Sequence, residues 1–346
     1  MIYKYTIALS SLCILLSLQS LEDVQLEYPD YFPEPNYNFD SNPLAKVKIE
    51  LGRYLFYDPI LSKDNSISCA SCHSPYNAFS HTDHDLSHGI NDQIGSRNAP
   101  ALFNLAWQRS FMWDGAVNHL DMQPLAPISH PKEMNENINN VVTKLQNSEL
   151  YPNLFSQAFG DTIITGENVL KAIAQFQLTL ISANSKYDQV KNGSAQFTDQ
   201  ESSGYILFSK NCSSCHSEPL FSSYDFAGNG LPVDTSLNDY GKWMITKNSK
   251  DSLLFKIPSL RNLSYTFPYM HDGRFKKLRQ VLNHYTSDLS QNKALSEKLR
   301  VPVILSSNEK ADLIAFLLTL NDEKFIFDTE NKFPKDLLNY NKNNVK

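Results

Sequence analysis

The strongest constraint on the fold is a pattern that occurs twice in this sequence of 346 residues. Gly52-Arg-Tyr-Leu-Phe56 leads to Cys69-Ala-Ser-Cys-His73, and Gly204-Tyr-Ile-Leu-Phe208 leads to Cys212-Ser-Ser-Cys-His216. Two copies of one unit predict two similar domains, and the length agrees at about 150 residues per domain. The first copy is longer between its glycine and its first cysteine, which indicates an insertion there.

Each C-x-x-C-H motif is the signal for covalent attachment of a c-type haem. Two thiols one helical turn apart reach the two vinyl groups of one porphyrin, and the adjacent histidine lies under the iron. A Cys₄ zinc site, a dithiol pair or a disulfide are alternatives, but none requires a histidine directly after both pairs. We therefore expect two haem c groups, attached through Cys69, Cys72, Cys212 and Cys215, with His73 and His216 as proximal iron ligands.

Composition and charge narrow the class of protein. With 41% hydrophobic and 20% charged residues, the chain has ample material for globular cores. It carries 31 Lys and Arg against 37 Asp and Glu, for a net charge of −6, and it has no basic block. Nucleic acid is therefore not an expected partner.

The N-terminus has the pattern of an export signal. Lys4 precedes an apolar stretch from Tyr5 to Leu18, and small or polar residues follow up to Ser20. The stretch of about 14 residues is too short to cross a hydrocarbon core of about 30 Å. We predict a signal peptide over residues 1–20, no membrane span in the mature chain and a periplasmic location. Lipidation at Cys13 is less favoured, because Leu12 stands where a small residue is expected.

Helical patterns dominate, and strand-like alternation is scarce. Apolar residues at helical spacing predict helices over 44–56 and 167–190. Capping boxes predict two further helix starts, at Thr198 with Glu201 and at Ser306 with Glu309. The polar segments between the helices are long loops, and loops of such length are usually functional. They cover residues 62–100 and 217–250.

Taken together, these residues resemble the bacterial dihaem cytochrome c peroxidases and their MauG relatives. The resemblance covers nearly all of residues 44–320. Beyond the haem motifs it rests on Gly95-Ser-Arg97-Asn98-Ala-Pro100, Phe111-Met-Trp113-Asp114-Gly115, Gln123, Glu133-Met134-Asn135, Ile257-Pro-Ser-Leu-Arg261-Asn262 and Pro268-Tyr-Met-His271-Asp-Gly273. The family fold that it implies is mainly α, with two cytochrome-c-like haem domains facing each other across a domain junction.

The resemblance also implies a division of labour, in which the first haem meets hydrogen peroxide and the second stores or relays electrons. It gives Glu133 the proton transfer that lets the O–O bond break, with Gln123 as its hydrogen-bonding partner. Trp113 matches a tryptophan between the haems, where an indole can pass an electron. His88 matches a loop histidine that caps the first haem, and His81 and His84 in the same loop are alternatives or solvated residues. Without the family, Glu133 reads as a surface acid and Trp113 as a core aromatic.

The distal ligand of the second haem separates the branches of the family. The resemblance places at Tyr285 the tyrosine of MauG-like members, where the electron-accepting peroxidases have methionine. By chemistry alone Met270, His271 and His284 are rival ligands, and Met270 is favoured among these because Met/His ligation is the usual cytochrome c pattern. A phenolate would lower the reduction potential of the second haem, whereas methionine would raise it.

The predicted organisation combines the repeat with these roles. Lys191-Asn-Gly-Ser194 interrupts the preceding helix, which places the domain junction near residue 190. The resemblance adds a calcium ion between the domains, held largely by carbonyl oxygens and waters, with Asn98, Thr266 and Pro268 as contributors. The domains are an N-terminal peroxidatic haem domain at 21–190, a C-terminal electron-transfer haem domain at 191–328 and a mobile tail at 329–346.

The expected activity is that of an exported dihaem peroxidase which reduces hydrogen peroxide and oxidises an electron donor through the second haem. The donor is a partner protein in a MauG-like enzyme and a small c-type cytochrome in a cytochrome c peroxidase. A dihaem cytochrome that only transfers electrons is a third interpretation. Glu133 and Gln123 argue against it, because an electron carrier needs no distal acid.

Overall fold

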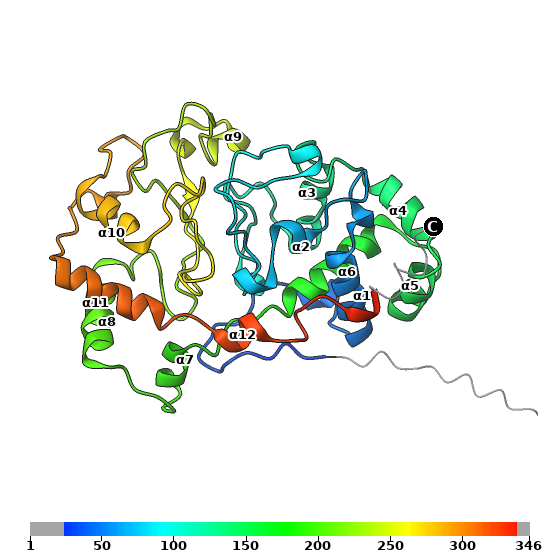
Figure 1. Cartoon of the computed structure of the whole chain (residues 1–346), viewed down its shortest axis with the longest axis horizontal. Coiled ribbons are helices and arrows are strands. Elements are labelled where there is room, and N and C mark those ends of the chain that lie inside the picture. Colours follow the sequence, from blue (N-terminus) through cyan, green and yellow to red (C-terminus); the bar gives the residue numbers. More distant parts are fainter. Residues whose placement is uncertain (1–23, 338–346) are drawn as a thin grey trace, which may run out of the picture.

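A computed structural model describes residues 24–337 of the chain. It has two lobes side by side (Figure 1), and the prediction of a mainly α fold is confirmed. In the described part, regular strand pairing is limited to β1 (Phe226–Ala227) and β2 (Phe255–Lys256), which run antiparallel. The predicted signal peptide and Cys13 lie outside the described residues. Within residues 24–337, no helix is long and apolar enough to cross a membrane.

The two lobes follow one another along the chain, and short turns of 3-10 helix connect many of the elements. The first lobe contains α1 (Lys46–Tyr57), α2 (Cys69–Cys72), α3 (Leu125–Ser129), α4 (Ile138–Gln146), α5 (Tyr151–Phe159) and α6 (Gly166–Leu178). The second contains α7 (Lys186–Lys191), α8 (Asp199–Asn211), α9 (Trp243–Thr246), α10 (Leu278–Ser287) and α11 (Ser307–Leu318), and α12 (Glu323–Phe327) follows. The 3-10 turns are η1 (Phe39–Ser41), η2 (Pro59–Leu61), η3 (Pro75–Asn77), η4 (Ile90–Asp92), η5 (Leu105–Trp107), η6 (Leu120–Met122), η7 (Ser249–Asp251) and η8 (Glu297–Leu299).

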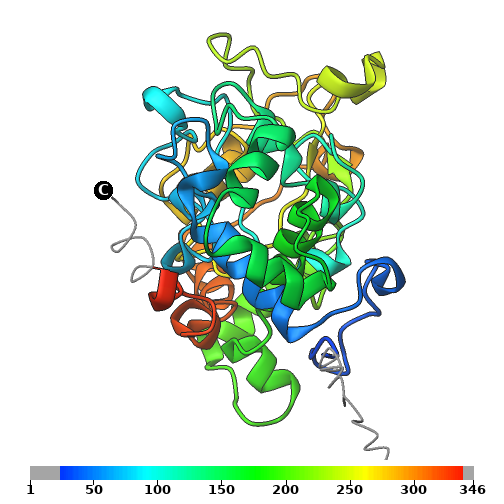
Figure 2. The ribbon, with the colours of Figure 1, turned by 90° about the vertical axis from the view of Figure 1, so that its right-hand side faces the viewer.

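The sequence repeat corresponds to one helix pair that both lobes share. α1 packs on α6 in the first lobe, which faces the viewer in Figure 2, and α8 packs on α11 in the second. A Cβ atom at Gly52 would lie 1.8 Å from the carbonyl oxygen of Ala172, and one at Gly204 would lie 2.0 Å from that of Asp312. Any side chain at these two positions would collide with the partner backbone. The repeated glycine therefore permits the close helix contact in each lobe.

The repeated phenylalanine has a matching role in the two lobes. Phe56 packs against Phe176 with ring centroids 5.2 Å apart, and Phe208 packs against Phe316 at 5.1 Å. These rings lie in separate apolar clusters, one around Phe56 and one around Phe208. A third cluster around Phe155 fills the outer side of the first lobe. The exact domain boundary near residue 190 stays a prediction.

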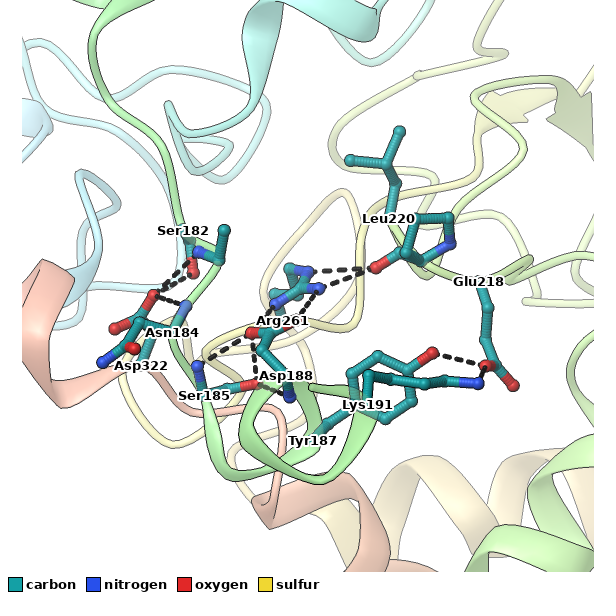
Figure 3. Close-up of polar contacts among 12 residues, drawn as sticks. Ser182, Asn184, Ser185, Tyr187, Asp188, Lys191, Glu218, Leu220, Arg261 and Asp322 are labelled. Carbon is teal, nitrogen blue, oxygen red and sulfur yellow. Dashed lines mark hydrogen bonds and ion pairs between the residues drawn. The ribbon is translucent and has the colours of Figure 1, made fainter. Parts of the chain in front are cut away.

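The single helix predicted over 167–190 is wrong, because the chain forms α6 and α7 with residues 179–185 between them. Oδ1 of Asn104 accepts the N–H of Ser182 at 2.9 Å, and the Asp322 carboxylate accepts the N–H of Asn184 at 2.8 Å (Figure 3). These side chains take backbone donors that a continuous helix would use.

Residues 329–337 differ from the mobile tail predicted to start at 329. The Tyr57 hydroxyl donates a hydrogen bond to the carbonyl oxygen of Asn331 at 2.6 Å. Leu337 is fully buried and belongs, like Phe325 of α12, to the core around Phe56. The chain therefore leaves the first lobe after α6 and returns to it at α12 (Figure 1).

Candidate active site

The first C-x-x-C-H motif forms one turn of helix, α2, and directs its histidine inward. The N–H of Ser68 bonds to the hydroxyl of Ser71 at 3.1 Å and steadies the start of this turn. Nδ1 of His73 donates to the carbonyl oxygen of Phe79 at 2.8 Å, which leaves Nε2 for another partner. Burial lowers the pKa of His73 to about 4, so the ring is the neutral imidazole that binds metals.

The second motif repeats this arrangement at the end of α8. Nδ1 of His216 lies 3.2 Å from the carbonyl oxygen of Phe221 and 3.1 Å from that of Pro258. Burial lowers the pKa of His216 to about 4 as well. All four motif cysteines are free thiols, and burial raises the pKa of Cys212 to about 12. In residues 24–337, no three His, Cys, Asp or Glu side chains are arranged to hold a metal ion.

Glu133 lies beside the first motif. Burial and the negative charge of Glu133 raise the pKa of the Cys72 thiol to about 11. Burial also raises the pKa of Glu133 itself, while His130, with Nδ1 3.7 Å from Oε1, opposes that rise. The Cys72 thiol donates to the carbonyl oxygen of His88 at 3.2 Å, and the N–H of Ile90 donates to that of Glu133 at 2.8 Å. These contacts place the predicted acid and the histidine loop at the same motif.

The three histidines of this loop form a stack. The ring centroids of His81 and His84 lie 5.5 Å apart, and those of His84 and His88 lie 4.1 Å apart. Nε2 of His81 is also 3.2 Å from Nδ1 of His84. The His88 ring thus packs on His84, and the capping role of His88 stays a prediction.

Gln123 is buried in the first lobe and pairs with a second glutamine that the sequence did not single out. Its Oε1 accepts from Nε2 of Gln177 at 3.3 Å, and its own Nε2 faces Sδ of Met112 at 3.8 Å. Among the described residues, no hydrogen bond joins Gln123 to Glu133. Gln177 lies between buried apolar residues of α6. A polar side chain on the buried face of a predicted helix was the signal that could have identified it.

Trp113 lies at the junction between the lobes. Its carbonyl oxygen accepts the N–H of Lys256 in β2 at 2.8 Å, and its indole N–H donates to the carbonyl oxygen of Asn98 at 2.9 Å. The N–H of Asn98 in turn donates to the carbonyl oxygen of His271 at 2.7 Å. The predicted relay residue therefore has direct backbone contact with the second lobe.

Arg97 joins the lobes by charge. Its Nη1 lies 2.6 Å from Oδ2 of Asp114 in the first lobe, and its Nε lies 2.6 Å from Oδ2 of Asp239 in the second. Burial alone would raise the pKa of Asp239, but the hydrogen bonds and charge of Arg97 outweigh burial and lower it. Arg97 belongs to one of the sequence blocks that carry the family resemblance, but its partner Asp239 on the other lobe was not predicted.

The predicted calcium contributors come from two segments of the chain, and the N–H of Asn98 in one segment donates to the carbonyl oxygen of His271, which follows the other. Asn98 is buried, and its side-chain amide donates to the carbonyl oxygen of Asp85 at 3.1 Å. Thr266 and Pro268 belong to the segment that leads to the predicted ligands of the second haem. No hydrogen bond of the described chain joins Asn98 to either of them, and the calcium ion stays a prediction.

Tyr285 in α10 lies beside the second motif. Burial raises the pKa of its phenol to about 12, although a hydrogen bond from Asn229 acts in the opposite direction. Cys212 and Cys215 are close enough to the phenol to raise the pKa further. The structure therefore brings Tyr285 to the same cysteine pair as His216.

The rival ligands occupy different positions around Asn229. The side-chain amide of Asn229 donates to Sδ of Met270 at 3.6 Å, so Met270 and Tyr285 share this neighbour. Nε2 of His284 lies 2.8 Å from the carbonyl oxygen of Asn229. The His271 ring stacks on the ring of Phe255 in β2, with centroids 3.7 Å apart. Both histidines therefore contact other groups, whereas Met270 and Tyr285 both contact the side chain of Asn229.

Arg261 contacts the loop that follows the second motif. It is fully buried, and Nη1 and Nη2 each lie 2.7 Å from the carboxylate of Asp188 (Figure 3). Nη2 also donates to the carbonyl oxygen of Pro219 at 2.8 Å. The guanidinium lies 5.6 Å from the ring centroid of Phe221, whose carbonyl oxygen orients His216. The ion pair thus holds the loop that orients His216, the predicted proximal ligand.

Comparison with known proteins identifies relatives of this chain over most of its length. Residues 46–196 match the family model of the di-haem cytochrome c peroxidases. The methylamine utilization protein MauG of Methylophilus methylotrophus is 36% identical over 300 residues, which cover 85% of this chain and 87% of the relative. The cytochrome c551 peroxidase of Nitrosomonas europaea is 33% identical over 280 residues, with 80% of each protein covered.

Solved structures show the same fold. A MauG-like protein associated with microbial copper homeostasis superposes with a TM-score of 0.80 at 30% identity, covering 90% of this chain and 99% of that one. The diheme peroxidase BthA from Burkholderia thailandensis superposes with a TM-score of 0.71 at 21% identity, covering 84% and 90%. The fold of residues 24–337 is therefore one that supports two haem groups in other proteins.

Proposed function

The chain belongs to the di-haem cytochrome c peroxidase family, to which MauG is related, and from this membership we propose an exported c-type peroxidase that reduces hydrogen peroxide at its first haem. Electrons come from a donor that is oxidised through the second haem. The observation that carries the proposal is the shared geometry of the two motifs. In each, a neutral histidine held through Nδ1 stands beside two free thiols.

The residues of both motifs fit covalently bound haem. Cys69 and Cys72 would hold the first group, with Nε2 of His73 as the iron ligand. Cys212 and Cys215 would hold the second, with Nε2 of His216. When bound, haem supplies an iron that exchanges electrons with peroxide and with the donor.

Glu133 is proposed to move the proton that peroxide cleavage requires. Its carboxylate would take a proton from one peroxide oxygen and deliver it to the other, so that the O–O bond breaks with water as the leaving group. Burial raises the pKa of Glu133 toward the working pH, which improves the proton transfer in both directions. Its side chain is still 30% exposed, so the proton can exchange with solvent.

We favour a MauG-like donor, namely residues of a partner protein, because Tyr285 lies beside Cys212 and Cys215. Trp113, at the junction of the lobes, would pass electrons between them. The specific alternative is a small c-type cytochrome as donor. That alternative is supported by Met270, which contacts the same Asn229 side chain as Tyr285.

The test uses the full chain made in a bacterium that attaches c-type haem. The mature protein should be recovered from the periplasm, cleaved near Ser20, and its mass should exceed that of the polypeptide by two haem groups. It should consume peroxide with an added electron donor. Bound zinc, a single haem, or two haems without any peroxide consumption would overturn the proposal.

We further infer a calcium ion at the junction, with Asn98, Thr266 and Pro268 contributing. The support on the side of this chain is that Asn98 is buried between the indole of Trp113 and the backbone of His271. Elemental analysis should find one calcium per chain, and its removal by a chelator should lower the melting temperature reversibly. A calcium-free protein of unchanged stability would overturn this inference.

A further inference from the structure

Two buried amides in the first lobe differ in how completely their hydrogen bonds are used. Gln177 of α6 is 3% exposed, and its Nε2 donates to Oε1 of Gln123 at 3.3 Å. Its own Oε1 is buried and has no hydrogen-bond partner among the described residues. An unpaired buried acceptor is costly, so a residue kept only for packing would be apolar at this position.

Gln175, two positions earlier on the same helix, provides the contrast. Its Nε2 donates to the carbonyl oxygens of Asn42 at 2.8 Å and Pro43 at 3.1 Å. Its Oε1 accepts the N–H of Ala45 at 3.1 Å. Because the fold uses every part of this amide, Gln175 has a structural role, whereas Gln177 retains a free acceptor.

The orientation of the Gln123 amide follows from Met112. A thioether sulfur accepts hydrogen bonds but cannot donate them, so Gln123 must present Nε2 to Sδ of Met112. Its Oε1 then faces Gln177, and Nε2 of Gln177 donates the hydrogen bond to it. Turning over either amide would bring two acceptors or two donors face to face. The order Met112, Gln123, Gln177 therefore fixes which atom of each amide is available.

We propose that Gln177 is a positioning residue of the peroxide pocket, which holds the Gln123 amide so that its N–H₂ group is the donor on the open side of the first haem. This proposal rests on the peroxide reaction proposed above and on the role beside Glu133 that the family resemblance implies for Gln123. The unpaired Oε1 of Gln177 adds an acceptor on the amide that binds Gln123. A donor and an acceptor together suit hydrogen peroxide, in which each oxygen carries a hydrogen and lone pairs.

The first test replaces the donor of Gln177 and measures a ligand rather than turnover. Fluoride bound to ferric haem accepts a hydrogen bond from a nearby donor, so its affinity reports the orientation of the Gln123 amide. In Gln177→Glu the ionised carboxylate cannot donate to Oε1 of Gln123, and the Gln123 amide should turn over to donate to it. The fluoride dissociation constant should rise about tenfold relative to wild type at high pH, the loss of one hydrogen bond, and recover when the introduced carboxyl is protonated.

Gln177→Met and Met112→Leu remove the two ends of the hydrogen-bonded chain without adding a charge. Both should weaken fluoride binding at every pH, and the rate constant for the ferric protein with peroxide should fall in parallel. The matched control is Gln175→Glu, the same substitution two residues away. It should lower thermal stability while leaving fluoride affinity, the spectrum of the first haem and the peroxide rate unchanged.

The outcomes separate this proposal from the function on which it rests. Wild-type fluoride affinity in Gln177→Glu and Gln177→Met, compared at equal haem content, would overturn the positioning role. If the Gln177 variants fail to take up haem, Met112→Leu decides, since unchanged fluoride binding there removes the basis for the fixed orientation. If the wild type binds fluoride but does not react with peroxide, the proposed function fails while the fluoride series still tests the amide pair.

Discussion

Glu133 is a partly exposed carboxyl whose pKa is raised by burial, and this combination leads to a pH dependence. If its carboxylate accepts the first proton of peroxide, the reaction rate should increase with pH through a pKa above the ordinary range of a glutamate. Glu133→Gln should slow the reaction about 10²- to 10⁴-fold and abolish that increase. Stopped-flow absorbance of the ferric protein with peroxide, at a series of pH values, measures both effects.

Glu149→Gln, at an exposed position, is the matched control for this substitution and should keep the wild-type rate and pH profile. Both variants should retain two haem groups. A Glu133→Gln protein that reacts like the control would show that another group transfers the proton.

Tyr285 and Met270 contact the same Asn229 side chain, so paired substitutions can decide between them. If Tyr285 binds the second iron, Tyr285→Phe should alter the absorption spectrum of that haem and raise its reduction potential, because an anionic donor is lost. Met270→Leu should leave both unchanged. The ferric protein should also react with peroxide without prior reduction. The reverse pattern would identify Met270 as the ligand and favour the cytochrome-oxidising alternative.

Among single residues, the sequence predicted those whose functional partners lie close to them along the chain. The C-x-x-C-H spacing lies within one turn of helix, so the cysteines and His73 could be found directly. Gln177 lies 54 positions from Gln123, and Arg97 lies 142 positions from Asp239. No spacing rule connects residues so far apart, and these partners could not be predicted.

For the helices too, the sequence predicted features set by neighbouring residues and missed those set by distant ones. The capping box of Thr198 and Glu201 is confirmed at the start of α8, where Oε2 of Glu201 accepts the N–H of Thr198 at 2.7 Å. The box of Ser306 and Glu309 is confirmed at α11. Both boxes span four residues. The break between α6 and α7 depends instead on Asp322, 138 positions from Asn184, and apolar periodicity carried no sign of it.

The helix pair that contains Gly204 predicts a sharp effect on stability. In Gly204→Ala the new methyl group would meet the backbone of α11 at Asp312, and α8 must shift away from it. Overpacking of this kind typically costs about 1–3 kcal/mol. Urea unfolding followed by circular dichroism should show this loss. Ser203→Ala, one position away on the exposed face of α8, should change the free energy of unfolding by less than about 0.5 kcal/mol. Equal stabilities would mean that the two helices are not held at this distance.

Across the whole molecule, Arg97 makes a charged contact between the lobes whose two carboxylate partners are buried. Arg97→Gln would leave Asp114 and Asp239 buried without their partner, and breaking a buried ion pair costs about 3–5 kcal/mol. The free energy of unfolding should fall by about that amount. Arg300→Gln breaks the exposed pair with Glu297 and should cost less than about 1 kcal/mol. If the two variants are equally stable, Arg97 does not hold the lobes together.

The return of the chain at α12 gives the molecule a particular topology. The second lobe is an insertion within the first, since both ends of the described chain pack on the first lobe. Two segments of the chain cross between the lobes, one after α6 and one before α12. The Asp322 carboxylate in the second segment accepts the N–H groups of Ala183 and Asn184 in the first, both at 2.8 Å. The two crossings are therefore joined to each other by hydrogen bonds. A protease that cuts one crossing segment would leave the lobes tethered by the other.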